Sequence, residues 1–174
     1  MSDLRALLEN TDAHVLHLAC HGVQDSNPLE SAILLQDGKL AIKDIMELHL
    51  PHAVLAFLSA CQTAKGDQSA PDQAIHIAAS MLFCGFKSVI GTMWFVHAAS
   101  ERTAEPLIVS LFRNYRLMHD ADGPSLAQRF YEVLFSKKHI DLDDVAYALD
   151  EGVQALRRAG VPAQRWALFM HMGG

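Results

Sequence analysis

The chain has 174 residues, of which 51% are hydrophobic and 20% are charged, a balance typical of one globular domain around one hydrophobic core. Its formal net charge of −6, without a cluster of Lys and Arg, argues against a groove that follows nucleic-acid phosphates. The three cysteines form no C-x-x-C pair, no apolar run could span a membrane, and the first residues do not resemble a signal peptide. We therefore expect a cytoplasmic protein in a reducing compartment.

The first half of the chain contains two short apolar runs, residues 15–20 and 53–60. Runs that are apolar throughout are typical of strands in a parallel sheet, which helices cover on both faces. Between them, residues 32–40 predict a hairpin that turns at Asp37-Gly38. Residues 42–48 then show helical spacing, and Pro51 ends that segment.

The rest of the chain continues with a helix and a strand before it becomes mostly helical. We expect a helix from Pro71-Asp72 to about Cys84, with Asp72 as its cap and Gly85 as its stop. A strand over 87–94 follows, and strand, helix, strand is the right-handed crossover unit of parallel sheets. Further helices are predicted over 103–117, 124–135 and 142–159, and a final strand over 165–172.

Residue types suited to nucleophilic catalysis follow the first two strands. The first strand runs into Cys-His-Gly at 20–22, and the second runs into Ser-Ala-Cys at 59–61. The carboxyl ends of parallel strands meet at one edge of a sheet, and neighbouring strands lie roughly 4.8 Å apart. A thiol at the end of one strand would therefore meet an imidazole at the end of the next.

This pair suits a cysteine nucleophile with a histidine base. A thiolate at Cys61 would attack a carbonyl, while the imidazole of His21 would activate the thiol and later protonate the leaving group. Gly22 leaves room for a substrate backbone beside the base. The amides of Gly22 and Cys61 together could form an oxyanion hole.

The same region also allows structural interpretations. Four residues have zinc-ligand side chains: His17, Cys20, His21 and Cys61. Residues 17 and 21 of an extended strand share a face while residue 20 points away, so we favour a chain without a metal site. His17 is then a hydrogen-bonded histidine inside the sheet, and Cys20 and Cys84 are packing residues in apolar runs.

Three ordered motifs resemble those of CHAT domains: His-Leu-Ala-Cys-His-Gly at 17–22, Leu-Ser-Ala-Cys-Gln-Thr at 58–63 and Val-Ile-Gly-Thr-Met-Trp at 89–94. CHAT domains belong with caspases, metacaspases, separases and gingipains in a clan of Cys-His peptidases. The resemblance is to fungal-type proteins in which a CHAT domain follows tetratricopeptide-type helical repeats. It implies that His21, rather than His17, is the base and that Cys61 is the nucleophile.

The resemblance implies a caspase-like α/β/α sandwich with a mostly parallel sheet. CHAT domains usually start well before the His-Gly strand, which begins here near residue 15. We therefore expect residues 1–174 to be the C-terminal portion of a single CHAT-like protease domain that lacks the family's first strands. The implied activity is that of a cysteine endopeptidase on a protein or peptide substrate. No cofactor, nucleic acid or membrane is implied, whereas a repeat domain or another regulatory partner fits the resemblance.

Relatives in this clan often hold a basic substrate side chain with acidic residues. Here a commonly acidic position at a helix start is Gln73, and the residues directly after Trp94 are not acidic. Strict specificity for Arg or Lys is therefore not expected. Trp94 either walls a substrate pocket or covers the core. The candidates for lining the pocket are Asp25, Asp67, Asp72, Trp94 and Glu101.

Two other functions stay open from the sequence. The late start of the His-Gly strand motivates a catalytically inactive CHAT-like module that acts in interaction or regulation. A small-molecule hydrolase or transferase would use the same dyad of Cys61 and His21.

Overall fold

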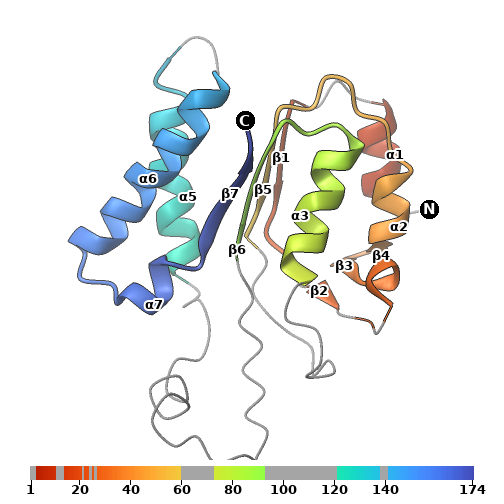
Figure 1. Ribbon diagram of the computed structural model, residues 1–174, viewed down its shortest axis with the longest axis horizontal. Coiled ribbons are helices and arrows are strands. Elements are labelled where there is room, and N and C mark those ends of the chain that lie inside the picture. Colours follow the sequence, from red (N-terminus) through yellow and green to blue (C-terminus); the bar gives the residue numbers. More distant parts are fainter. Residues whose placement is uncertain are drawn as a thin grey trace, which may run out of the picture.

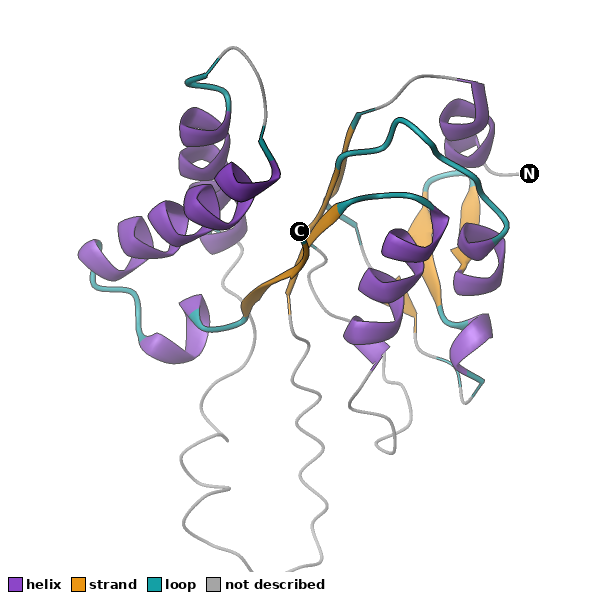
Figure 2. Cartoon of the chain, turned by 45° about the horizontal axis from the view of Figure 1, so that its top comes forward, coloured by secondary structure: helices purple, strands orange, loops and turns teal. Residues whose placement is uncertain are grey.

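The computed structural model describes residues 3–10, 14–20, 22–23, 25, 27–59, 73–92, 121–137 and 141–174. In this part of the chain, a four-stranded sheet lies between two groups of helices, which Figure 1 and Figure 2 show on opposite sides of it. A second, three-stranded sheet lies on the side of the N-terminal helices (Figure 1). The layers form the α/β/α sandwich that the alternating strands and helices predict.

The main sheet contains four strands in the spatial order β1-β5-β6-β7. Strands β1 (Val15–Leu18), β5 (Leu55–Leu58) and β6 (Ser88–Thr92) are parallel neighbours, and β7 (Phe169–Gly173) runs antiparallel to β6. The helix α3 (Gln73–Cys84) lies between β5 and β6 in the chain, as the connection of two parallel strands requires. The prediction of a mostly parallel sheet is confirmed.

The strands of the main sheet differ in how completely they are buried. Strands β5 and β6 are buried along their whole length, whereas burial alternates along β1. The first strand was predicted to be covered on both faces, and this is wrong: His17 is exposed, while Leu16 and Leu18 are buried. The reason is position, because β1 lies at an edge of the described sheet and β5 lies inside it. β1 also ends earlier than predicted, at Leu18 instead of residue 20.

One face of the main sheet is covered by α1 (Asp3–Asn10), α2 (Ile42–Met46) and α3. Leu16 and Leu58 of the sheet pack into one cluster with side chains of these three helices, Leu8, Ile45 and Met81. Burial of each such side chain stabilises the fold by about 1.5–3 kcal/mol. This cluster is called the first-face core below.

The smaller sheet is antiparallel, with the order β2-β3-β4. It contains β2 (Gly22–Val23), β3 (Ala32–Leu35) and β4 (Gly38–Ala41), and a 3-10 helix, η1 (Pro28–Glu30), precedes β3. The hairpin is confirmed, but its turn is shifted by one residue: Leu35 pairs with Gly38, so Gln36 and Asp37 make the turn. Gly38 has a φ of 151°, which lets β4 begin directly after a two-residue turn.

The other face of the main sheet is covered by α5 (Asp122–Leu134) and α6 (Leu142–Arg158). Phe57 and Ile90 of the sheet pack there against Phe130 of α5 and Val145 of α6, all of them fully buried. This cluster is called the second-face core below. Both helices agree with the predictions over 124–135 and 142–159 to within two residues.

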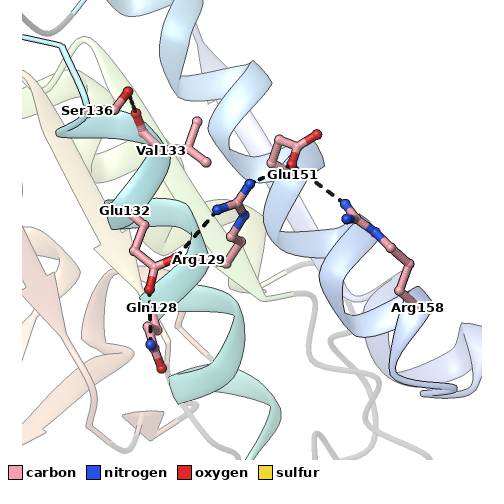
Figure 3. A network of polar contacts seen from close by, with 7 residues as sticks. All are labelled: Gln128, Arg129, Glu132, Val133, Ser136, Glu151 and Arg158. Atoms are coloured by element: carbon pink, nitrogen blue, oxygen red, sulfur yellow. Dashed lines mark hydrogen bonds and ion pairs between the residues drawn. The ribbon is translucent and has the colours of Figure 1, made fainter.

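Ion pairs join α5 to α6 on their outer surface (Figure 3). Arg129 Nη2 of α5 lies 3.1 Å from Glu151 Oε2 of α6, and Arg158 Nη2 lies 3.6 Å from the same oxygen. Arg129 also contacts Glu132 on its own helix, at 3.5 Å. Because the arginines are exposed, these pairs contribute little, about 0–1 kcal/mol each, and the second-face core holds the two helices together.

The end of α3 and the start of α6 lie where the sequence predicts them. Gly85 stops α3 with a φ of 126°, and the Phe86 amide donates to the Met81 carbonyl oxygen at 3.1 Å, which closes the last turn. A Cβ at Gly85 would collide with the carbonyl oxygen of Leu50, so only glycine fits there. Asp141 caps α6 by accepting a hydrogen bond from the Asp143 amide.

The C-terminal segment differs from the predicted strand over 165–172. Arg165 and Trp166 belong to a short helix, α7 (Ala163–Trp166), and the strand begins only at Phe169. Arg165 donates through Nε and Nη2 to both carboxylate oxygens of Asp122, at 2.6 and 2.5 Å. Since Asp122 is buried and opens α5, this bidentate pair ties α7 to α5 and favours the helical turn over an extended chain.

The predicted helix over 103–117 and the predicted cap at Asp72 lie outside the described residues. Within the described part of the chain, no helix is both long and apolar enough to cross a membrane.

Candidate active site

The strands that precede the two predicted catalytic motifs are parallel neighbours (Figure 1). Val15 pairs with Leu55 and Leu18 pairs with Leu58, so β1 and β5 end side by side. The Ser59 amide donates to the Leu18 carbonyl oxygen at 3.0 Å, which extends the ladder by one residue. The segments that follow β1 and β5 therefore leave the sheet at the same edge, as the sequence predicts.

Most of the predicted site residues lie outside the described part of the chain. These are His21, Cys61, Asp67, Asp72, Trp94 and Glu101. Their roles as base, nucleophile and pocket residues stay predictions. What the structure describes is the strand ends that lead to them and the residues around those ends.

Gly22, which directly follows the predicted base, opens β2 and is buried. It pairs with Ile33 of β3, so the chain passes from the end of β1 into the smaller sheet within four residues. This short passage fixes the path of the backbone on both sides of residue 21. The role of the Gly22 amide in an oxyanion hole stays a prediction.

Asp25 is exposed and takes part in a local turn. Its Oδ1 accepts a hydrogen bond from the Asn27 amide at 3.0 Å, and its own amide donates to Ser31 Oγ at 3.1 Å. An aspartate that bonds to the backbone two residues on stabilises a turn by itself. The geometry thus gives Asp25 a structural task, and its role as a pocket residue stays a prediction.

Cys20 and Cys84 are packing residues, as predicted. Both are free thiols that contact the first-face core, and burial raises the pKa of each thiol. The Cys84 thiol, 1% exposed, also donates to the Met81 carbonyl oxygen at 3.2 Å. A raised pKa leaves little thiolate near neutral pH, so neither cysteine has the character of a nucleophile.

His17 is hydrogen-bonded, as predicted, but it lies on β1, at the edge of the described sheet, and not inside that sheet. Its Nε2 is 3.1 Å from Ser59 Oγ, and its ring contacts those of Phe57 and Tyr131, with centroids 4.8 and 5.6 Å away. Although the side chain keeps an exposed side, partial burial lowers the pKa of His17, so the ring is neutral near pH 7. The Ser59 contact was not foreseen, because only the register of β1 and β5 reveals it.

The arrangement weighs against a metal site that uses Cys20. His17 contacts Phe57 of the second-face core, whereas Cys20 packs against the first-face core, so the two side chains lie on opposite faces of the sheet. Among the described residues, no three His, Cys, Asp or Glu side chains gather closely enough to hold an ion.

A mostly parallel sheet in the order β1-β5-β6-β7, with helices on both faces, is consistent with a caspase-like α/β fold. The family model of the CHAT domain matches residues 1–174, and the chain belongs to this family. A comparison with curated proteins found no match.

Proposed function

We propose that this protein is a cysteine endopeptidase in which Cys61 and His21 form a catalytic dyad. One observation carries the proposal: β1 and β5 are parallel neighbours in register, and the His-Gly and Ala-Cys motifs come shortly after their carboxyl ends in the sequence. Ligands of parallel sheets bind outside the carboxyl ends of the strands, which is where these motifs begin. Membership of the CHAT family, whose fold is caspase-like, supports the same chemistry.

The proposed reaction begins when His21 takes the proton of the Cys61 thiol and the sulfur attacks the carbonyl carbon of a peptide bond. The amides of Gly22 and Cys61 stabilise the negative oxygen of the tetrahedral intermediate. His21 then gives the proton to the leaving amine, which leaves an acyl group on the sulfur. Water attacks this thioester with His21 as base, and the acid product leaves as the thiol forms again. Every step is balanced without a metal or an organic cofactor.

The proposed substrate is a protein or peptide in an extended conformation. Trp94 and the acidic residues Asp25, Asp67, Asp72 and Glu101 are the candidates for lining its pocket. A cytoplasmic location agrees with the two described cysteines, Cys20 and Cys84, which are both free. A helical-repeat domain or another regulatory protein is the proposed partner.

Hydrolysis of a panel of fluorogenic peptides by the wild type and by Cys61→Ala tests the proposal. We expect the wild type to hydrolyse at least one of these peptides. Cys61→Ala should lower this turnover by about 10³-fold or more, since the nucleophile is lost. Cys20→Ala is the matched control, because it removes a thiol of the same region, and it should keep wild-type activity. Equal turnover in wild type and Cys61→Ala would overturn the dyad, and no turnover in either would favour an inactive regulatory module.

A further inference from the structure

Two hydrogen bonds join Ser59 to β1 at the carboxyl ends of the paired strands. The amide of Ser59 donates to the Leu18 carbonyl oxygen at 3.0 Å, and its Oγ lies 3.1 Å from Nε2 of His17. One bond uses the backbone and the other uses side chains 42 residues apart in the chain. Ser59 is 8% exposed, so little of this residue faces water, whereas His17 is exposed.

The ring of His17 is held in place from two sides. Phe57 of β5, the register partner of His17, contacts it with a centroid distance of 4.8 Å, and Tyr131 of α5 contacts it at 5.6 Å. Tyr131 is stacked in turn on Phe135, at 5.5 Å and 6°. A ring fixed by aromatic neighbours loses little further freedom when it bonds to Ser59, so the contact is preorganised.

The pair lies close to the predicted dyad in the sequence. Ser59 precedes Cys61 by two residues, and His17 precedes His21 by four. A bond between Ser59 and His17 thus holds together the two strand ends from which the chain continues to Cys61 and His21. Reacting groups tolerate little displacement, since a misplacement of about 1 Å can cost about 10²-fold in rate.

We propose that His17 and Ser59 are positioning residues that set the separation of Cys61 and His21. This inference rests on the proposed function, because it assigns the pair to that dyad. We assign neither residue a bond-making step in the reaction. The neutral ring of His17 bonds to Ser59, and Ser59 fixes the point from which the chain continues to Cys61.

The protein contains a chemically matched pair that serves as the control. Ser88 Oγ lies 2.7 Å from Nε2 of His171, and this pair joins β6 to β7 on the same face of the sheet. Ser88 is the first residue of β6 and pairs with Leu55, the first residue of β5. The control pair therefore lies at the amino ends of the parallel strands, opposite to the end where Ser59 lies.

The test measures the rate at which iodoacetamide alkylates Cys61 at pH 6 in the full chain, with peptide mass spectrometry to separate Cys61 from Cys20 and Cys84. The thiolate fraction of Cys61 at this pH depends on how closely the imidazole of His21 is held. We expect Ser59→Ala and His17→Leu to slow the alkylation of Cys61 by about 10-fold or more. Ser88→Ala should leave the alkylation rate of Cys61 within about twofold of wild type, although it should lower the melting temperature about as much as Ser59→Ala does.

Two further variants separate positioning from folding. His17→Gln places an amide near the position of Nε2, so it should recover most of the wild-type rate. The double variant Ser59→Ala with His17→Leu should be no slower than the slower single variant, because both remove one bond. His17 is exposed on an edge strand, so His17→Leu breaks the bond without creating a buried cavity.

The outcomes distinguish the two proposals. Suppose that Cys61 reacts faster than Cys20 in the wild type, and that Cys61 reacts equally fast in Ser59→Ala. The positioning role is then overturned and the dyad stands. If the alkylation rate of Cys61 falls equally in Ser88→Ala and Ser59→Ala, the positioning role is also overturned, because the effect is then general destabilisation. If wild-type Cys61 reacts no faster than Cys20, the proposed function fails and the inference fails with it.

Discussion

The two ends of the parallel strands carry the same side-chain contact in different surroundings. At the amino ends, Ser88 is fully buried and bonds to His171 of β7. At the carboxyl ends, Ser59 bonds to His17, which keeps an exposed side on the edge strand. Burial lowers the pKa of both histidines, so both rings are neutral near pH 7.

The difference between these ends shows how one sheet can separate stability from chemistry. The pair at the amino ends joins β6 to β7, whereas the pair at the carboxyl ends lies where the chain leaves the sheet toward the predicted dyad. Substitutions at the amino ends should change stability alone. Substitutions around His17 should change stability and the reactivity of Cys61 together, and the following predictions test this contrast.

Phe57→Ala should have the largest effect on stability. The Phe57 ring is fully buried in the second-face core and contacts His17, Phe130 and Tyr131. Removing it should lower the free energy of unfolding by about 3–5 kcal/mol, and urea denaturation measures this loss. Because His17 loses one of its ring contacts, alkylation of Cys61 should slow as well. A large loss of stability with an unchanged rate, measured below the unfolding transition, would break the link between His17 and the dyad.

Gly85→Ala should lower stability at the other end of the sheet without affecting Cys61. The positive φ of 126° and the nearby Leu50 carbonyl oxygen both disfavour a Cβ at this position. We expect a loss of about 1–3 kcal/mol in thermal or chemical denaturation. Gly160→Ala is the control, since a Cβ there would meet no atom within 4 Å, so its cost comes from the positive φ of 77° alone. Slower alkylation of Cys61 in folded Gly85→Ala would contradict the separation of the two ends.

Acidification should lower stability through both histidines. Burial depresses the pKa of His17 and of His171 in the folded state, whereas unfolded histidine keeps its ordinary value of about 6.5. Below that pH the unfolded chain binds more protons, so the free energy of unfolding falls as the pH drops through 6.5 toward the depressed values. His17→Gln and His171→Gln should each flatten this dependence in urea denaturation between pH 7 and 5. An unchanged slope in either variant would show that the histidine titrates equally in both states.

Arg129→Gln should have the smallest effect. Its ion pairs with Glu132 and Glu151 lie on the outer surface of α5 and α6, where water and salt screen them (Figure 3). The expected loss is below about 1 kcal/mol, and 0.5 M salt should reduce it further. Measuring the melting temperature at two salt concentrations checks this, and a loss as large as that of Phe57→Ala would show that the network, rather than the core, joins the two helices.

Much of this fold could be predicted because local patterns and burial agree. The apolar run of β5, the stop at Gly85 and the helix α6 all appear in the structure where the sequence indicates them. Burial of β5 on both faces explains why its sequence has no alternation.

The features that sequence patterns missed depend on contacts between distant residues. The helical turn at Arg165 is held by Asp122, 43 residues earlier in the chain. The exposure of His17 follows from the place of β1 at the sheet edge, which its four-residue sequence does not reveal. The bond between His17 and Ser59 likewise needs the register of two strands. For the candidate site, the sequence therefore identified the motifs, while the structure added the contact between His17 and Ser59 at the strand ends that precede them.

The most direct test of the dyad is the pH dependence of Cys61 alkylation in the wild type and in His21→Ala. A thiolate held by an imidazole stays reactive at pH 6, whereas burial raises the pKa of the Cys20 and Cys84 thiols and confines their reaction to alkaline pH. The account predicts that Cys61 reacts at pH 6 nearly as fast as at pH 8 and that His21→Ala abolishes this reactivity at low pH. The dyad would be contradicted if the alkylation rate of Cys61 rose with pH as the rates of Cys20 and Cys84 do, or if it were unchanged in His21→Ala.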